Sequence, residues 1–315
     1  MAKGDQAISS EQLEKTADPK RILLAINPNA AFAKKDKATR GSRAAETLRS
    51  IGHEVEELVE ASYIRLEEAI SRKLPDADVL VVAGGDGMMH LGVNRAIAAA
   101  KPLGLIPAGT GNDASRILEI SQDPVVASLQ IDNALRNGSR LVDTLRITGE
   151  GFERYAFGML SAGFDALVNE RANIMHSPKG PSRYTLAMLA ELAQLKPRKY
   201  KFTVDGETRE TDAILIAVSN NQFCGGGMRF VPHAQVDDGQ IEVFVLKPLG
   251  RAKFLSIFPK VFSGRHVEHA DLVEFFRGTE VSVEASDIVG YADGERLDSL
   301  PLTVKVMPSS LEMLV

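Results

Sequence analysis

Between Arg21 and Asn137 the chain alternates short, continuous apolar runs with longer runs whose apolar residues recur at helical spacing. The short runs predict strands at 21–28, 53–59, 78–85 and 102–107. The longer runs predict helices at 38–51, 88–100, 112–119 and 124–136. Strands that alternate with helices pack into a mostly parallel sheet with both faces covered, so this part predicts an α/β domain.

After Gly138 the pattern changes to short β-rich runs separated by turn dipeptides, which is typical of antiparallel sheets. Helical runs at 182–195 and 251–263 interrupt them. The sequence therefore predicts a flexible tail (1–20), an α/β domain (21–137) and a β-rich antiparallel sandwich (138–315). The last run, LEMLV, is a candidate to return to the first domain.

Composition places the chain among soluble globular proteins, with 44% hydrophobic and 25% charged residues in a total of 315. The net charge of −5 argues against a general nucleic-acid binder. Cys224 is the single cysteine, so no internal disulfide can form, which fits a reducing compartment. The first 20 residues lack a secretory apolar region, and no apolar run approaches the roughly 20 residues of a spanning helix. We expect a cytoplasmic protein that reaches a membrane only from its inner face, and transiently.

A glycine-rich loop, Gly84-Gly85-Asp86-Gly87, follows the buried run 78–84 just before a predicted helix. Open α/β sheets bind ligands at the carboxyl ends of their strands. Glycines allow close backbone approach to phosphates, a helix N-terminus offers free N–H groups, and a carboxylate suits Mg²⁺. The alternative is a tight turn with Asp86 as the N-cap of the helix.

Two further loops follow predicted strands and are expected at the same sheet edge. One contains Gly109, Thr110 and Asn112, which can hold phosphate or ribose or, in the case of Asn112, cap the next helix. The other is Asn27-Pro28-Asn29-Ala30-Ala31. The loops match neither the Walker nor the Rossmann pattern, yet together they predict a nucleotide site.

Five motifs occur in a fixed order: GGDG, PAGTGNDASR, SAGFDALVNERAN, VDDGQIEV and YADGERL. From about residue 21 to the end, this order resembles the soluble bacterial diacylglycerol kinases, and SAGFDALVNERAN resembles their actinobacterial members most. The resemblance implies an enzyme of phospholipid metabolism that uses ATP and Mg²⁺. It would transfer the γ-phosphoryl group to the hydroxyl of diacylglycerol and so produce phosphatidic acid.

The resemblance also implies roles for individual residues. Glu295 matches the general base, with Asp293 beside it as an orienting or metal-linked carboxylate. Asp238, with backbone oxygens of Gln235 and Gln240, matches a structural magnesium site. The resemblance also implies that Asp86 takes part in a magnesium network between the two domains. The expected ATP-site residues are Asn27, Pro28, Asn29, Ala30, Ala31, Gly84, Gly85, Asp86, Gly87, Gly109, Thr110 and Asn112.

Two features qualify these assignments. Asp205-Gly206-Glu207 repeats the tripeptide of 293–295 between two strand-like runs, where it predicts a hairpin turn, and only motif order favours Glu295 as the base. Residues 237–239, Asp-Asp-Gly, likewise favour a simple turn when they are taken apart from the motif order. The family also usually has threonine and then Asn-Glu after GGDG, where this chain has Met88, Met89, His90 and Leu91. We expect His90 on the helix surface.

The two helical runs of the second domain carry apolar stripes flanked by basic residues. The stripes are Leu186, Leu189, Leu192 and Leu195 in one run, and Phe254, Phe258 and Phe262 in the other. They favour a membrane surface or an acyl-chain cleft, or else packing on the sheet. A sphingoid or ceramide-type acceptor, an NAD kinase and a nucleotide-binding regulator without turnover remain alternatives, and the sequence leaves a homodimer open.

Overall fold

The computed structural model describes residues 16–27, 39–175, 177 and 181–315, which fall into two compact units. Unit 1 comprises Met1–Thr110, Leu118–Arg140 and Glu312–Val315. Unit 2 comprises Gly111–Ile117 and Leu141–Leu311. The sequence placed 112–119 in the first domain, whereas the structure groups Gly111–Ile117 with unit 2.

Unit 1 is built on a parallel sheet of strand order β2-β1-β3-β4, and Met313 at the end of β18 (Leu302–Met313) pairs in parallel with Leu103 of β4. These strands are β1 (Arg21–Ile26), β2 (Glu54–Val59), β3 (Val79–Gly84) and β4 (Leu103–Pro107). The helices are α2 (Arg40–Ser50), α3 (Tyr63–Lys73), the short η2 (Leu74–Asp76), α4 (Asp86–Ala99) and α6 (Pro124–Asn137). All residues of β3 and β4 are buried, which explains their continuous apolar sequences.

Unit 2 contains two antiparallel sheets whose facing sides enclose one hydrophobic core. The first sheet contains β5 (Arg140–Gly149), β6 (Phe152–Ala156), β8 (Arg198–Val204), β9 (Glu207–Ala213), β15 (Glu280–Glu284) and β18. The second has the order β14-β13-β10-β7-β16-β17, with β7 (Met159–Gly163), β10 (Leu215–Ser219), β13 (Ile241–Leu246), β14 (Val273–Gly278), β16 (Val289–Ala292) and β17 (Glu295–Ser299). The predicted fold class, a parallel α/β domain followed by an antiparallel β-rich domain, is confirmed.

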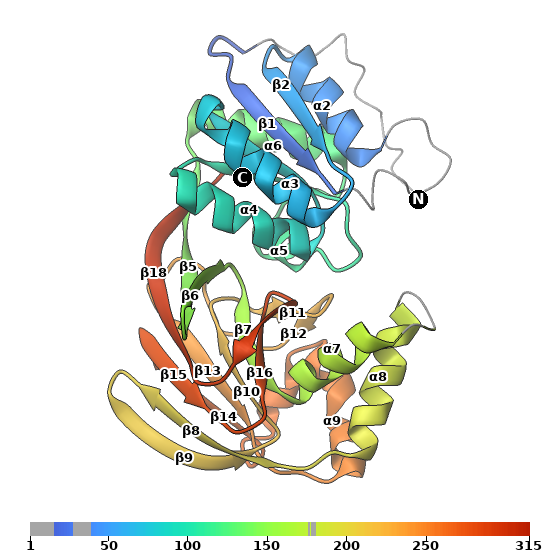
Figure 1. Cartoon of the computed structure of the whole chain (residues 1–315), viewed down its shortest axis with the longest axis vertical. Coiled ribbons are helices and arrows are strands. Elements are labelled where there is room, and N and C mark those ends of the chain that lie inside the picture. Colours follow the sequence, from blue (N-terminus) through green and yellow to red (C-terminus); the bar gives the residue numbers. More distant parts are fainter. Residues whose placement is uncertain (1–15, 28–38, 176, 178–180) are drawn as a thin grey trace. The chain divides into compact units, whose positions relative to one another are not determined.

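Smaller elements of unit 2 are α5 (Asp113–Ile117), the hairpin β11 (Phe223–Cys224) and β12 (Met228–Arg229), α7 (Phe164–Ile174), α8 (Pro181–Ala193), α9 (Arg251–Val261) and η3 (Arg265–Glu268). Figure 1 shows α7, α8 and α9 gathered together within this unit. They pack on the second sheet through a separate apolar cluster, in which the rings of Phe164 (α7) and Phe254 (α9) lie 4.9 Å apart. None of the described helices is long and apolar enough to cross a membrane.

Candidate functional site

The carboxyl ends of β1, β3 and β4 lie side by side in unit 1. The amide of Asn27 donates to the Ala83 carbonyl at 3.0 Å, and the amide of Ala108 donates to the Gly84 carbonyl at 2.8 Å. Strand order reverses between β1 and β3, because β2 follows on one side of β1 and β3 on the other. Ligand sites of open α/β sheets lie at such a switch point. The described parts of the predicted loops therefore lie where a nucleotide is expected.

The glycine-rich loop opens α4. Gly85 is the N-cap residue of this helix and Asp86 lies in its first turn, so the interpretation of Asp86 as the N-cap is wrong. The Gly85 carbonyl accepts the amides of Met88 and Met89. The start of α4 thus presents backbone N–H groups and one carboxylate at the strand ends, a combination suited to a phosphate group and its cation.

The predicted ATP-site residues are divided between parts of the chain. Asn27, Gly84–Gly87, Gly109 and Thr110 are at the strand ends of unit 1. Asn112 belongs to unit 2, where it is buried with a φ of 54°. Pro28, Asn29, Ala30 and Ala31 lie outside the described residues.

Arg40 was missed by the sequence reasoning. It is exposed, and its Nη1 donates to the carbonyls of Pro107, at the end of β4, and Gln122, at 2.9 and 2.8 Å. A cation is therefore held at the same sheet edge as the glycine loops. Its position in the first turn of the predicted helix 38–51 is a signal that the sequence contained.

Met88 packs beneath the loop. Its side chain is 2% exposed, and a Cβ built on Gly84 would lie 2.3 Å from Met88 Cγ. His90 is also buried, so its expected surface position is wrong. The departure from the usual threonine thus places a core side chain, and not an alternative phosphate ligand, at this position.

We expect Met88→Thr to destabilise the protein by about 1–3 kcal/mol, because it removes buried apolar volume and buries a hydroxyl. Thermal or urea unfolding measures this loss. Val126→Thr is the control, because Val126 is 40% exposed within unit 1 and its replacement should shift the midpoint little. An unchanged midpoint for Met88→Thr would contradict the packing role.

The Asp293-Gly294 turn joins β16 to β17 and carries Glu295. Asp293 and Gly294 have φ values of 49° and 87°, as in the tight turn of a two-residue hairpin. The Asp293 carboxylate accepts the backbone amides of Phe157, Gly158 and Met159 at 2.8, 2.9 and 3.0 Å. Asp293 therefore fixes the turn against the loop before β7, while its expected role as an orienting or metal-linked carboxylate stays a prediction.

The polar surroundings of this turn were not predicted. Asn220 follows β10 and donates its amide side chain to the carbonyl of Asp143 at 2.9 Å, and its backbone amide donates to that of Gly158 at 2.8 Å. Asp143 is buried, and its carboxylate accepts the amides of Gly239 and Ser309. The signal available was the polar run SNNQ directly after an apolar strand.

The two Asp-Gly-Glu tripeptides form the same kind of turn with different partners. Asp205 and Gly206 have φ values of 46° and 89°, and the Asp205 carboxylate accepts the amides of Thr279 and Glu280. These hydrogen bonds lower the pKa of Asp205. Glu207 then pairs with Arg209 at 2.6 Å. Glu295 is exposed, and its carboxylate has no hydrogen-bond or ion-pair partner in the described parts of the chain.

The expected structural magnesium site is not favoured by the side chains present. One Asp238 oxygen accepts the Gln240 amide at 3.0 Å, and the other is paired with the Arg277 guanidinium. Arg277 lies opposite Glu242 in the β13–β14 register and approaches its carboxylate at 3.5 Å. A guanidinium beside Asp238 neutralises the carboxylate that a divalent cation would need. No cluster of three metal-ligating side chains occurs among the described residues.

Asp113 holds α5 within unit 2. Its carboxylate accepts the amide of Gly226 at 2.7 Å, in the Gly225–Gly227 loop between β11 and β12, where all three glycines have positive φ. Burial raises the pKa of Asp113. The segment directly after Thr110 is therefore anchored by the glycine hairpin, which explains why it separates from unit 1.

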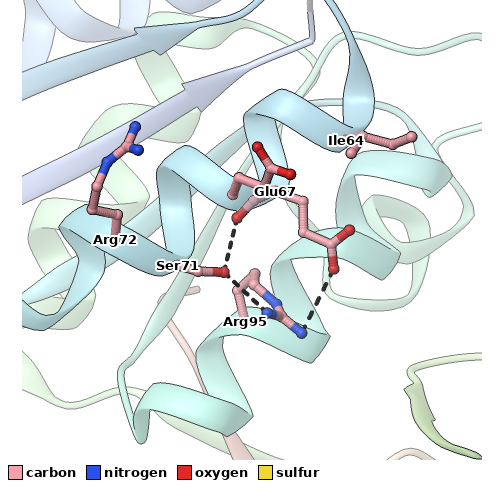
Figure 2. A pocket seen from close by; sticks show the side chains of 6 residues that line it. Ile64, Glu67, Ser71, Arg72 and Arg95 are labelled. Carbon is pink, nitrogen blue, oxygen red and sulfur yellow. Dashed lines mark hydrogen bonds and ion pairs between the residues drawn. The ribbon is translucent and has the colours of Figure 1, made fainter.

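A surface hollow of about 530 Å³ lies between α3 and α4 and contains none of the predicted site residues (Figure 2). Ser71 Oγ donates to the Glu67 carbonyl at 2.8 Å and accepts from Arg95 Nη1 at 3.0 Å. Arg95 also lies 3.6 Å from a Glu67 carboxylate oxygen. Ser71, Glu67 and the Nη atoms of Arg95 therefore bond to one another across the hollow.

Comparison with known proteins identifies the family. Residues 21–147 match the diacylglycerol kinase catalytic domain, and residues 158–315 match the YegS C-terminal NAD kinase beta sandwich-like domain. The chain belongs to the diacylglycerol kinase family. This confirms the resemblance drawn from motif order, and it makes the chain a phosphotransferase of the lipid-kinase type.

Relatives in the family cover most of the chain. A diacylglycerol kinase of Mycobacterium tuberculosis (strain ATCC 25618 / H37Rv) is 36% identical over 240 residues, which are 75% of this chain and 76% of the relative. A diacylglycerol kinase of Bacillus subtilis (strain 168) is 25% identical over 72% of this chain and 74% of its own. A probable lipid kinase YegS-like of Stenotrophomonas maltophilia (strain K279a) is 30% identical over 55% of this chain and 57% of its own.

Solved structures share the fold. A putative diacylglycerol kinase from Bacillus anthracis str. Sterne has a TM-score of 0.72 at 22% identity, covering 93% of this chain and 96% of that one. An NAD kinase from Archaeoglobus fulgidus in complex with ATP has a TM-score of 0.52 at 13% identity, covering 93% and 92%. By TM-score, the fold of this chain is more similar to that of the Bacillus anthracis protein than to that of the NAD kinase.

Proposed function

We propose that the protein transfers the γ-phosphoryl group of ATP to the hydroxyl of diacylglycerol, giving ADP and phosphatidic acid. Relatives named diacylglycerol kinase support this acceptor. The observation that carries the proposal is the contrast between the two Asp-Gly-Glu turns: Glu207 is ion-paired, whereas Glu295 has an exposed carboxylate at a turn that Asp293 holds in place.

In the proposed reaction, the start of α4 and the neighbouring strand ends hold the ATP phosphates through backbone N–H groups. The lipid oxygen forms a bond to the γ-phosphorus, and the bond from that phosphorus to the bridging oxygen of ADP breaks. Glu295 accepts the proton from the lipid hydroxyl. The protein contributes mainly alignment and a correctly placed base, as phosphoryl transfer requires.

Asp86 fits a magnesium ion bound together with ATP. Mg²⁺ usually takes one or two carboxylates, the substrate phosphates and waters, so a single carboxylate beside a phosphate-binding helix start is sufficient. Bound there, the ion would offset negative charge on the phosphates. Asp238 is not included in this proposal, because Arg277 neutralises it.

The acceptor can be tested by incubating the purified chain with γ-labelled ATP and, in separate reactions, diacylglycerol micelles, ceramide micelles or NAD. Labelled phosphatidic acid alone is the expected result. Labelled ceramide phosphate or NADP would replace the proposed acceptor with the corresponding alternative. ATP binding without any labelled product would favour a regulator.

We also propose that α7, α8 and α9 contact the membrane that supplies the lipid. The apolar stripes are divided: Leu192 and Phe254 are buried, whereas Leu186, Leu189 and Phe262 are 46%, 47% and 53% exposed. Exposed apolar residues flanked by basic ones suit an anionic surface. The exposed basic residues are Lys196, Lys199, Arg251, Lys253 and Arg265.

Replacing both Leu186 and Leu189 with glutamate should weaken binding to vesicles of phosphatidylglycerol and phosphatidylcholine by about 10-fold or more, since each leucine would lose roughly 1 kcal/mol or more of apolar burial. Co-sedimentation measures this binding. Leu141→Glu is the matched control, because Leu141 is 53% exposed on β5. Equal binding of the double variant and the control would contradict the proposed surface.

A further inference from the structure

The β16–β17 hairpin, which carries the proposed base, is also held by a helix. Tyr291 and Arg296 face each other in the register of the hairpin, and Ala292 faces Glu295. Glu170 of α7 binds both strands through one oxygen. Its Oε1 accepts the Tyr291 hydroxyl at 2.5 Å and Arg296 Nε at 2.8 Å. Glu170 therefore joins the two strands one residue pair below the pair that contains Glu295.

The two hydrogen bonds to Glu170 contribute unequally to holding the hairpin. The side chain of Arg296 is 53% exposed, and exposed ion pairs contribute little. Tyr291 is 1% exposed, so its hydroxyl depends on protein partners. Asn173 Nδ2 donates to the same hydroxyl at 3.1 Å. The buried Tyr291 hydroxyl is thus the main link between α7 and the hairpin.

The protonation states fit this link. Burial, and then the hydrogen bond to Glu170, raise the pKa of Tyr291 to about 12, so that the phenol remains a donor. The hydrogen bond from Tyr291 lowers the pKa of Glu170, so that this carboxylate remains an ionised acceptor. At neutral pH the contact is a charge-assisted hydrogen bond, which is stronger than one between neutral groups.

Both anchors of the hairpin come from one continuous segment. Asp293 is bound by amides that include that of Met159, the first residue of β7. α7 follows β7 directly and carries Glu170, which contacts Tyr291 and Arg296. β7 also pairs with β16 at Tyr291 and Ala292. The Asp293-Gly294 turn is therefore fixed at its tip by the start of β7. The strand residues next to the turn, Tyr291 and Arg296, are fixed by α7.

From this geometry we propose that Glu170 and Tyr291 are positioning residues that hold Glu295 in place for phosphoryl transfer. This inference rests on the proposed function. It gives a role to SAGFDALVNERAN, the motif that contains α7. A misplacement of about 1 Å can lower a rate by about 100-fold, so losing one anchor while Asp293 remains should cost less, about 10-fold.

Kinetics of Tyr291→Phe test the proposal. We expect kcat for lipid phosphorylation to fall about 10-fold, with little change in the KM for ATP, because the base is misplaced while the nucleotide site is untouched. Glu170→Gln should have a smaller effect, because its amide oxygen still accepts the phenol. In a Glu295→Gln background, Tyr291→Phe should cause no further loss.

Tyr155 and Glu153 on β6 provide a matched control. The Tyr155 hydroxyl donates to Glu153 at 3.1 Å, and Arg146 lies 3.8 Å from the same carboxylate. Tyr155→Phe removes a similar hydroxyl from unit 2 without touching the hairpin, so its kcat should equal that of the unaltered protein. Amide hydrogen exchange of residues 293–296 should rise in Tyr291→Phe and stay unchanged in Tyr155→Phe.

Three outcomes would overturn the proposal. They are an unchanged kcat in Tyr291→Phe, an equal fractional loss of kcat when Tyr291→Phe is introduced into the unaltered protein and into Glu295→Gln, and unchanged amide hydrogen exchange of residues 293–296. An equal loss would indicate a general loss of folded enzyme. If the unaltered protein forms no lipid phosphate, the proposed function fails. The exchange measurement then still reports whether Tyr291 holds the hairpin.

Discussion

Replacement of Glu295 with glutamine is expected to lower kcat for lipid phosphorylation by about 10²–10⁴-fold, the usual contribution of a positioned general base. Glutamine has the same shape but cannot accept the hydroxyl proton. Because Glu295 is exposed and unpaired within the described chain, the melting temperature should stay nearly unchanged. Steady-state kinetics with labelled ATP and a thermal melt provide both readings.

The control for this substitution is Glu207→Gln. Glu207 is exposed, stands at the same place in the other Asp-Gly-Glu turn and pairs with Arg209 of β9. Its loss should leave kcat unchanged and alter stability by less than about 1 kcal/mol, as for other exposed ion pairs. Near-normal activity of Glu295→Gln would show that another group accepts the proton.

Asp293→Ala should affect both stability and activity. It removes the carboxylate that accepts three backbone amides, from Phe157, Gly158 and Met159. Hydrogen bonds to charged groups contribute about 1.5–3 kcal/mol each, but the contributions do not simply add and water can replace part of them, so we expect a loss of about 2–4 kcal/mol. Since the turn then loses its tip anchor, kcat should also fall by about 100-fold or more.

Asp205→Ala separates these two effects. Asp205 makes comparable bonds, because its carboxylate accepts the amides of Thr279 and Glu280 and the Thr279 hydroxyl. Urea unfolding should show destabilisation in both variants, whereas only Asp293→Ala should lose kcat when rates are compared per folded molecule. Equal kcat in the two variants would remove the orienting role of Asp293.

The fold was predictable because its signals are local. The continuous apolar run of β3 reflects complete burial, and the following glycines mark the start of α4. α7 was not predicted, because only Phe164, Ala166 and Ala172 are buried, too narrow a stripe to show helical periodicity. α3 and β14 were also not predicted.

The candidate site was predictable only in part, because its decisive contacts join distant residues. The two Asp-Gly-Glu turns have the same local geometry, and their difference lies in what surrounds them. Arg277 reaches Asp238 from 39 positions away through the β13–β14 register. Neither periodicity nor motif order contains that information. Similarly, the apolar stripe of α8 did not indicate that Leu192 turns inward while Leu189 faces outward.

The loop before β7 also limits how this chain can vary. A Cβ on Gly158 would lie 2.6 Å from Asp293 Oδ1 and 2.8 Å from Asn221 Nδ2. Even the smallest side chain at 158 would therefore displace the carboxylate that holds the turn. Gly158 must stay a glycine as long as Asp293 holds the turn, so mutagenesis libraries that aim to alter the lipid acceptor should keep both positions fixed.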